Sequence, residues 1–277
     1  MQVFIVDASV IFHLINSRLQ QYALSHEDKE LYVKASLLWI NALGMMPYFA
    51  GADGCKVIWV MDSKPYWRSQ YYPKYKANRT SKPDVNHVRQ VFDSLQLLSI
   101  EVEGYEADDL AAMFCVLFKK RSLRSQWSQL YLLTVDTDWQ GLIEDGITWV
   151  DVNRHQPVVR DLPRVYTWFE KKHGAQPKKW QKYYELPHAK DFHPTDIWKW
   201  KTIVGDKSDN LPPECDYHLI NLYEPHSEHT LWMRQDVVRE AKALIDKPVA
   251  FCRYSHKEMT TILNGLGISM PLSYIVM

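Results

Sequence analysis

Short apolar runs that end in aspartate recur along the chain, and segments with helical spacing separate them. Runs of this length, rich in β-branched and aromatic residues, are typical of strands that are buried on both faces of a parallel sheet. We expect such strands at 3–7, 57–62, 130–136 and 147–152. Strands that alternate with helices predict an α/β fold, in which helices flank a central, mostly parallel sheet.

Helical spacing predicts helices over 29–43, 85–98 and 106–123. The last of these has the clearest pattern, because basic residues gather at its end, where they suit the helix dipole. Three acids open it, namely Glu106, Asp108 and Asp109. Residues two positions apart do not face each other on a helix. The three acids can therefore act together only if the helix is just starting at Glu106, so that they point in different directions.

The chain divides by composition near residue 155, after which proline, lysine and tryptophan become frequent. We expect a core over 1–155, which includes a basic segment at 64–90, and a mostly helical part over 156–277. No run of 18 apolar residues is present, so no membrane-spanning helix and no membrane partner are expected. The N-terminus does not resemble a signal peptide, and the four cysteines are far apart, which predicts a reduced, cytoplasmic setting.

The charges balance exactly in number, with 33 basic and 33 acidic residues, which argues at first against nucleic acid as a partner. Their distribution changes this picture. Seven basic residues and one acid lie between 64 and 89, and ten basic residues and five acids lie between 160 and 201. Each basic stretch is either a solvated surface or a surface for phosphate groups, and composition alone leaves both readings open.

Several carboxylates fall where the predicted elements meet. Asp7, Asp62 and Asp136 each end a strand, so they should converge at the carboxyl edge of the sheet. A single aspartate there is more often a helix N-cap. With them we group six further acids: Glu106, Asp108, Asp109, Asp138, Asp206 and Asp209. Clustered carboxylates repel one another unless cations neutralise them, and such a set suits Mg²⁺ or Mn²⁺, with enough ligands for two ions.

Six short motifs occur in a fixed order between residues 3 and 213. They are Val6-Asp7-Ala8-Ser9, Val60-Met61-Asp62-Ser63, Arg68 with Tyr75-Lys76-Ala77-Asn78-Arg79, Glu106-Ala107-Asp108-Asp109, Thr134-Val135-Asp136-Thr137-Asp138, and Gly205-Asp206-Lys207-Ser208-Asp209-Asn210. In this order the chain resembles the flap endonuclease and 5′-to-3′ exonuclease superfamily, which includes phage 5′ nucleases and the nuclease domain of bacterial DNA polymerase I. Its compact length and its Tyr-Lys-Ala-Asn-Arg motif are most similar to phage-type members.

The resemblance implies a PIN-like nuclease core and two groups of metal ligands. Asp7, Asp62, Glu106 and Asp108 would hold the first ion, directly or through water. The second ion would be surrounded by Asp109, Asp136, Asp138, Asp206 and Asp209. The two ions would activate a water and stabilise the charge on the phosphate that is cut. The setting would be a bacterial or phage-infected host cell.

The resemblance also implies that the basic segment 64–90 forms a helical arch over the site. Lys76 and Arg79 would act in catalysis, and they match positions that contact the phosphate and the 5′ strand. The DNA-binding set implied in this way comprises Arg68, Lys74, Tyr75, Lys76, Arg79 and Lys82. Aromatic side chains of the segment either offer faces to unstacked bases or pack the arch against the core, and for Trp67 and Tyr72 we favour packing.

The sequence departs from the family after Asp209. A glycine-rich helix-hairpin-helix turn, which holds a monovalent cation and grips the duplex, usually follows the Gly-Asp motif. Here no glycine occurs between Gly205 and Gly265. Close approach of backbone to phosphate usually needs glycine. Duplex affinity would then come from lysines and aromatics within 160–201. Alternatively, these aromatics form the core of a helical subdomain. A further alternative is that a single-strand-binding protein or a polymerase delivers the DNA.

Together these patterns predict a Mg²⁺-dependent 5′ nuclease that degrades DNA from free 5′ ends or removes 5′ flaps, in replication, primer removal or DNA degradation. One alternative is an RNase H-like enzyme that mainly removes RNA primers from RNA–DNA hybrids. The alternative from another class is a catalytically silent, structure-specific DNA-binding protein. The intact acid set argues against that alternative, because a binding protein gains nothing from repelling carboxylates beside phosphate.

Overall fold

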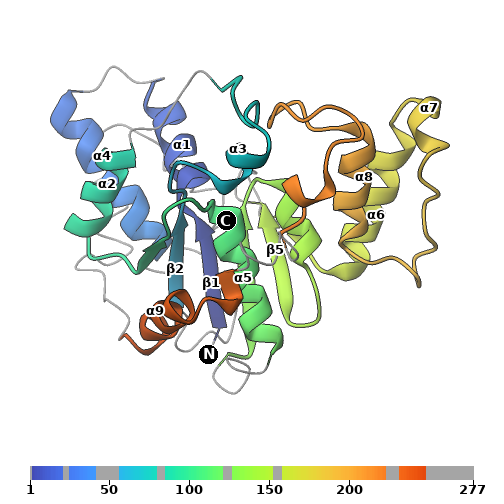
Figure 1. Ribbon diagram of the computed structural model, residues 1–277. Helices are drawn as coiled ribbons and strands as arrows, with labels where there is room; N and C mark the ends of the chain where they lie inside the picture. Colours follow the sequence, from blue (N-terminus) through green and yellow to red (C-terminus); the bar gives the residue numbers. More distant parts are fainter. Residues whose placement is uncertain are drawn as a thin grey trace.

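The computed structural model describes residues 2–20, 25–41, 56–79, 85–120, 127–151, 158–222 and 231–247. Its centre is one six-stranded sheet with the strand order β3-β2-β1-β4-β5-β6 (Figure 1). The strands are β1 (Gln2–Asp7), β2 (Lys56–Met61), β3 (Ser99–Glu101), β4 (Gln129–Thr134), β5 (Ile147–Asp151) and β6 (Val158–Arg160). The first five run parallel and only β6 is antiparallel, which confirms the predicted sheet.

The four predicted strands correspond to β1, β2, β4 and β5. Strand β1 lies at the centre, where Val6 is in register with Trp59 of β2 and with Leu133 of β4. The strands β3 and β6 are not anticipated by the apolar pattern, because each has three residues and no apolar run long enough to stand out. Parallel order brings the carboxyl ends of β1, β2 and β4 to one edge of the sheet.

Helices cover both faces of this sheet, as expected for parallel strands joined by crossovers (Figure 1). The predicted helices are α2 (His26–Asn41), α4 (Val85–Ser94) and α5 (Ala107–Lys119). Helix α5 is almost wholly buried, from Leu110 to Phe118 on most of its circumference. Helix α1 (Ala8–Leu19) is not among the predicted helices, although Asp7 before it accepts from Val10 N (3.0 Å) in the manner of an N-cap.

The remaining elements come after β6. They are α6 (Leu162–Gly174), α7 (Lys178–Gln181), α8 (Asp196–Val204), the 3₁₀ helices η3 (Tyr217–Leu219) and η5 (Leu231–Met233), and α9 (Gln235–Asp246). The buried core is continuous from β1 to α9, so both predicted parts share it. Buried Lys56 of β2 donates to the carbonyls of Leu244 (3.4 Å) and Lys247 (2.8 Å), which ties the end of α9 to the sheet. In the described residues, no helix is long and apolar enough to cross a membrane.

The predicted arch segment, 64–90, is described at 64–79 and 85–90. It consists of the short helix α3 (Trp67–Tyr71), a series of turns to residue 78, and the start of α4. Trp67 is buried in the core and Tyr72 packs partly against it, as favoured from the sequence. Lys82, one of the predicted DNA contacts, lies outside the described residues.

Candidate functional site

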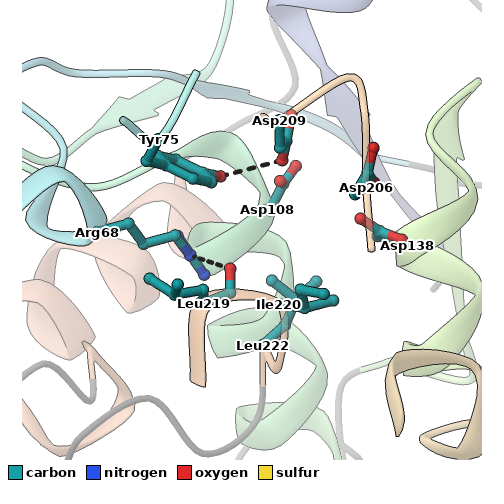
Figure 2. Close-up of a pocket in the computed structure, with 9 residues that line it drawn as sticks. All are labelled: Arg68, Tyr75, Asp108, Asp138, Asp206, Asp209, Leu219, Ile220 and Leu222. Atoms are coloured by element: carbon teal, nitrogen blue, oxygen red, sulfur yellow. Dashed lines mark hydrogen bonds between the residues drawn. The ribbon is translucent and has the colours of Figure 1, made fainter. Parts of the chain in front are cut away.

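Acidic side chains gather at the carboxyl edge of the sheet, as the strand ends predict. Asp7 is the last residue of β1, Asp62 follows β2 and Asp136 follows β4 by two residues. The start of α5 brings Asp108 beside them. A small cavity opens there (Figure 2), and the residues that line it are Arg68, Tyr75, Asp108, Asp138, Asp206, Asp209, Leu219, Ile220 and Leu222.

Helix α5 begins where the acids require it to begin. Glu106 is its N-cap with extended backbone (φ −96°, ψ 160°), and its side chain forms a capping box with Asp109. The amide of Glu106 donates to Asp109 Oδ2 (3.1 Å). Asp108 points elsewhere and accepts a hydrogen bond from Trp139 Nε1 (2.7 Å). Asp108 therefore faces different surroundings from Glu106 and Asp109, which share the capping box.

Four carboxylates form what we call the central group: Asp7, Asp62, Asp108 and Asp136. In the described part of the chain none of them has an ion pair, and their hydrogen-bond donors are uncharged. Asp7 accepts from Val10 N and Thr134 Oγ1, both at 3.0 Å. Asp62 accepts from Ala107 N (2.8 Å) and Ser9 Oγ (3.3 Å), and Asp136 from Asp138 N (2.8 Å). The group is buried at Asp7 and half-buried at the other three residues, and it has no basic partner of its own in this part of the chain.

The electrostatics of the central group follow from this arrangement. Burial, and then the neighbouring Asp62, raises the pKa of Asp7 to about 7. Burial also raises the pKa of Asp62, against the opposing effect of Lys76. Burial followed by the charge of Asp136 raises the pKa of Asp108 well above its usual value. A divalent cation would relieve this cost, and hard carboxylate oxygens are the ligands that Mg²⁺ and Mn²⁺ prefer.

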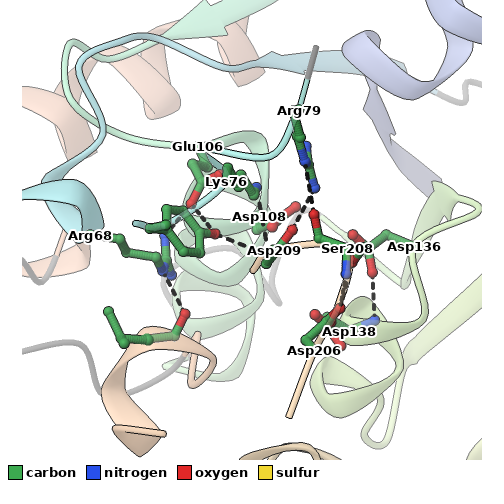
Figure 3. Close-up of polar contacts among 12 residues, drawn as sticks. Arg68, Lys76, Arg79, Glu106, Asp108, Asp136, Asp138, Asp206, Ser208 and Asp209 are labelled. Atoms are coloured by element: carbon green, nitrogen blue, oxygen red, sulfur yellow. Dashed lines mark hydrogen bonds and ion pairs between the residues drawn. The ribbon is translucent and has the colours of Figure 1, made fainter. Parts of the chain in front are cut away.

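The other five acids form a peripheral group, in which each side chain pairs with a basic residue of the chain itself. Figure 3 shows Lys76 with Glu106 and Arg79 with Asp209. Arg68 is 1% exposed, and its guanidinium donates to both oxygens of Asp109 (2.7 and 2.8 Å) and to Glu106 Oε2 (2.8 Å). Its Nε donates to the carbonyl of Leu219 (3.0 Å). Arg68 was predicted to contact DNA, but the structure buries it, because two carboxylates at the start of α5 use its donors.

Lys76 and Tyr75 also contact Glu106. The Lys76 ammonium forms an ion pair with Glu106, and the Tyr75 hydroxyl donates to Glu106 Oε2 (2.8 Å). Burial alone would raise the pKa of Glu106, but Lys76 and Arg68 lower it to about 2. Lys76 has a left-handed backbone (φ 53°), and its amide donates to the carbonyl of Asp209 (2.9 Å). This turn fixes Lys76 at the rim of the central group.

Asp209 joins the arch segment to the turn after α8. It forms an ion pair with Arg79 (2.5 Å) and accepts from the Tyr75 hydroxyl (3.2 Å). The Arg79 side chain remains 47% exposed while it pairs with Asp209, which lines the cavity. Lys74 is exposed, and its carbonyl accepts from Asn210 Nδ2 (2.8 Å) and from Ala77 N (3.1 Å). Of the predicted DNA contacts, Lys74 and Arg79 are thus open to solvent, whereas Arg68 and Tyr75 are buried.

Lys201 completes the peripheral group, and it was not among the predicted site residues. Its ammonium forms ion pairs with Asp138 and with Asp206 (2.6 Å). Burial raises the pKa of Asp138 to about 7, although Lys201 acts in the opposite direction. Burial would raise the pKa of Asp206, yet Lys201 and Ser208 lower it to about 2. A lysine in the last helical turn before Gly205-Asp206 is the only sequence signal that could have identified it.

The turn after Asp206 differs from a glycine-rich hairpin, as the sequence indicates. Gly205 has φ +79°, and a Cβ atom there would lie 2.7 Å from the Leu211 carbonyl oxygen and 2.7 Å from Pro213 N. The chain folds back tightly, with Asp206 and Leu211 bridged. Between 211 and 222 the structure has only the 3₁₀ helix η3, so this described stretch contains no helix-hairpin-helix.

No three His, Cys, Asp or Glu side chains in the described ranges lie close enough to hold one metal ion in this conformation. The Lys76 ammonium stands beside Glu106 and the Lys201 ammonium beside Asp138, and the two lysines supply part of the positive charge at the site. The donor chemistry fits a divalent cation, since the central group is a set of buried and half-buried carboxylates that have no ion pair among the described residues. The division of the acids between two ions stays a prediction.

Comparison with known proteins agrees with this site. The sequence model of a family described as "5′-3′ exonuclease, N-terminal resolvase-like domain" matches residues 2–170, which carry seven of the nine acids. The chain belongs to this 5′-3′ exonuclease family. The superfamily resemblance is thereby confirmed. The match ends before α8, so Asp206, Asp209 and Lys201 lie beyond the part that it covers.

Bacterial DNA polymerases I are among the similar sequences. The thermostable DNA polymerase I of Thermus aquaticus is 30% identical over 166 residues, which is 58% of this chain and 16% of the polymerase. DNA polymerase I of Caldicellulosiruptor bescii is 29% identical over 151 residues, or 52% of this chain and 15% of that protein. The chain thus corresponds to about a sixth of these relatives.

Solved structures of bacteriophage T5 proteins share the fold. One, co-crystallised with metal ions, has a TM-score of 0.50 and 17% identity over 99% of this chain and 87% of its own. A second, the T5 flap endonuclease in a pseudo-enzyme–product complex with DNA and metal ions, has a TM-score of 0.50 and 15% identity, and covers 99% of this chain and 96% of its own. At this identity the likeness confirms the α/β nuclease fold.

Proposed function

We propose that this protein is a metal-dependent 5′-3′ exonuclease and 5′ flap endonuclease that hydrolyses DNA phosphodiesters near free 5′ ends. The observation that carries the proposal is the central group, Asp7, Asp62, Asp108 and Asp136, which lies at the carboxyl edge of the sheet. Asp7 is buried, the other three are half-buried, and none has a basic partner among the described residues. Membership of the 5′-3′ exonuclease family supports the reaction, and the T5 relative with DNA and metal ions supports the kind of substrate.

The central group, with Glu106 and the acids of the second set, would hold Mg²⁺ or Mn²⁺, with two ions as the fuller form of the proposal. Bound there, the ions supply an activated water and stabilise charge on the phosphate and on the leaving oxygen. Thr134 and Ser9 fix the orientations of Asp7 and Asp62 through hydrogen bonds of 3.0 and 3.3 Å. Trp139 and the amide of Ala107 do the same for Asp108 and Asp62. The carboxylates are therefore preoriented by neutral donors.

Lys76 and Arg79 are placed to receive the phosphate. Both lie between the central group and solvent, and each is held by an acid of the peripheral group, Glu106 or Asp209. A phosphate that enters the cavity would replace the carboxylates as the partner of these two cations. Because Lys76 and Arg79 already stand beside the site, they would orient the phosphate without a large movement. Arg68 acts differently. Its guanidinium is paired with Glu106 and Asp109, so its contact with DNA stays a prediction.

Product mapping tests the proposal directly. End-labelled duplex, nicked and 5′-flap substrates, with DNA and RNA 5′ strands side by side, should be cut near the 5′ end in Mg²⁺. EDTA should stop cleavage and Mg²⁺ or Mn²⁺ should restore it, because the carboxylates need the cation. Preference for RNA 5′ strands would favour primer removal as the main activity. Cleavage that resists EDTA, or binding without any cleavage, would contradict the proposal.

A further inference from the structure

Five lysines at the end of α6 and on α7 form a surface that the nuclease site does not use. We call it the lysine surface, and it comprises Lys171, Lys172, Lys178, Lys179 and Lys182. All five are exposed, and none has an ion pair among the described residues. This contrasts with the cavity, where Arg68, Lys76, Arg79 and Lys201 are all paired. Lysines without partners present positive charge outward, and Glu170 and Glu185 are the exposed acids nearest in sequence.

The surface is held in shape rather than being a loose chain of charges. The Lys179 ammonium lies 4.8 Å from the centre of the Trp180 ring, and Lys182 lies 5.1 Å from that of Tyr183. Gln181 Nε2 donates to the carbonyls of Gly174 (3.2 Å) and Gln176 (2.6 Å), which joins α7 to the end of α6. Cation–π contacts and these hydrogen bonds limit how far the lysines can move, so they lose less conformational entropy when they bind a ligand.

The lysine surface stands close to the acidic cavity and on the same side of the molecule. His173, next to Lys172, packs on Trp200 with ring centres 4.8 Å apart, and the following residue, Lys201, forms ion pairs with Asp138 and Asp206. In Figure 1, α7 lies at the end of the molecule toward which β1 runs. Helix α8 separates the two regions, so they are roughly 10–20 Å apart, one to two helix diameters.

The aromatic residues of this region decide what kind of nucleic acid fits. Trp198 and Trp200 are buried, and Trp168, Trp180 and Tyr184 pack partly against the core. Only Tyr183, at 60% exposure, is open. Proteins bind single strands by stacking successive bases on exposed aromatic side chains, and these packed rings are not exposed enough to do so. A duplex instead needs basic side chains along its phosphate backbone. The aromatics of this stretch thus form a core, as one of the two readings predicts, and the lysines face solvent.

We infer that the lysine surface binds the phosphate backbone of double-stranded DNA on the duplex side of the cleavage site. The inference rests on the proposed function. A turn of B-DNA is about 34 Å long, so the surface meets phosphates within about half a turn of the one in the cavity. The lysine surface would supply a duplex contact in place of a helix-hairpin-helix, which the described part of the turn after Gly205 does not form. The bound chemistry is a polyphosphate backbone, with no base sequence read.

The test compares two triple variants of equal charge. One replaces Lys178, Lys179 and Lys182 with alanine. The control replaces Arg239, Lys242 and Lys247 of the α9 region, which are exposed, have no ion pair among the described residues, and lie away from the cavity (Figure 1). Dissociation constants for a labelled 20-base-pair DNA hairpin are measured by fluorescence anisotropy in EDTA at several salt concentrations, and kcat and KM are measured in Mg²⁺.

We expect the α7 variant to bind the hairpin more weakly, by roughly 10-fold or more near 0.1 M salt. The slope of the logarithm of the binding constant against the logarithm of the salt concentration should become shallower by about two to three, because each phosphate contact contributes about 0.9. Its kcat at saturating duplex should stay within about twofold. Equal losses in the control, an unchanged salt slope, or equal weakening for single-stranded DNA would overturn the inference. If the wild-type chain cuts no substrate but the α7 variant still loses duplex affinity, the proposed function fails while the lysine surface stands.

Discussion

The central and peripheral carboxylates lie within one site, yet they differ in what neutralises them. The peripheral acids Glu106, Asp109, Asp138, Asp206 and Asp209 each pair with a basic side chain of the protein. Among the described residues, the central acids Asp7, Asp62, Asp108 and Asp136 meet only hydroxyl, indole and amide donors. The described protein thus neutralises one group with its own basic side chains, and under the proposed function a divalent cation would neutralise the other.

This difference assigns separate tasks to the two groups. A paired carboxylate can position a cation of the protein, as Glu106 positions Lys76 and Asp209 positions Arg79. An unpaired buried carboxylate stabilises nothing until a cation arrives, because burial penalises its charge. If the comparison is right, substitutions in the central group should remove the chemistry. Those in the peripheral group should alter stability or substrate positioning.

The largest effect is expected for the central group. Replacing Asp108 or Asp136 with alanine should lower kcat by about 10³-fold or more, because a metal ligand is removed, while duplex binding in EDTA stays within about threefold. Cleavage of a labelled flap substrate measures the first, and anisotropy the second. Asp93→Ala, at an exposed position at the end of α4, is the matched control. Unchanged turnover in both central variants would refute the assignment.

Arg68 should matter more for stability than any exposed cation of the site. Arg68→Met leaves Glu106 and Asp109 buried without their partner, which should lower the free energy of unfolding by roughly 3–5 kcal/mol in urea titrations. Arg79→Met, on a side chain that is half exposed, should cost about 1 kcal/mol or less. Similar losses in the two variants would mean that the buried pairs of Arg68 are not what holds the start of α5.

The difference between the two groups also marks how far the sequence could predict the site. Asp7, Asp62 and Asp136 were identifiable because a strand end is a local feature and parallel strands share one edge. The helix over 106–123 followed from the helical spacing of its apolar residues, and its start at Glu106 from the three acids, which can act together only at the beginning of a helix. The roles of Arg68 and Lys201 were not predictable, because Arg68 finds its partners 38 and 41 residues away and Lys201 pairs with Asp138, 63 residues away. Such pairings depend on packing between distant elements, which no local pattern records.

Lys76 should affect cleavage more than binding. Lys76→Ala removes the cation at the rim of the central group, so kcat for a 5′-flap substrate should fall by roughly 10²-fold, as for the loss of one preorganised electrostatic contact. The dissociation constant for duplex DNA should change by less than about threefold. Lys74→Ala, on an exposed lysine of the same turn, should leave kcat nearly unchanged. Parallel losses of kcat and affinity would make Lys76 a simple tether for the strand.

The smallest effect concerns stability and pH in the absence of divalent cations. Burial raises the pKa of folded Asp7 to about 7, from an ordinary value of 3.8, so the folded state keeps a proton that the unfolded chain releases between these values. Stability must therefore fall as pH rises from about 4 to 7. The lowered pKa values of Glu106 and Asp206, about 2 each, act below pH 5 with the opposite sign and leave the higher range undisturbed.

In EDTA, the free energy of unfolding should accordingly drop by roughly 2–4 kcal/mol between pH 5 and pH 8, and Mg²⁺ should restore much of it at pH 8. Asp7→Asn keeps an oxygen for the Val10 amide and should make the profile less steep, since it removes one of the protons involved, while Asp138, whose pKa burial also raises to about 7, retains part of the slope. Urea titrations across this range measure both proteins. A wild-type profile that rises with pH, or an Asp7→Asn profile as steep as the wild type, would show that the central group does not carry the uncompensated charge on which the comparison rests.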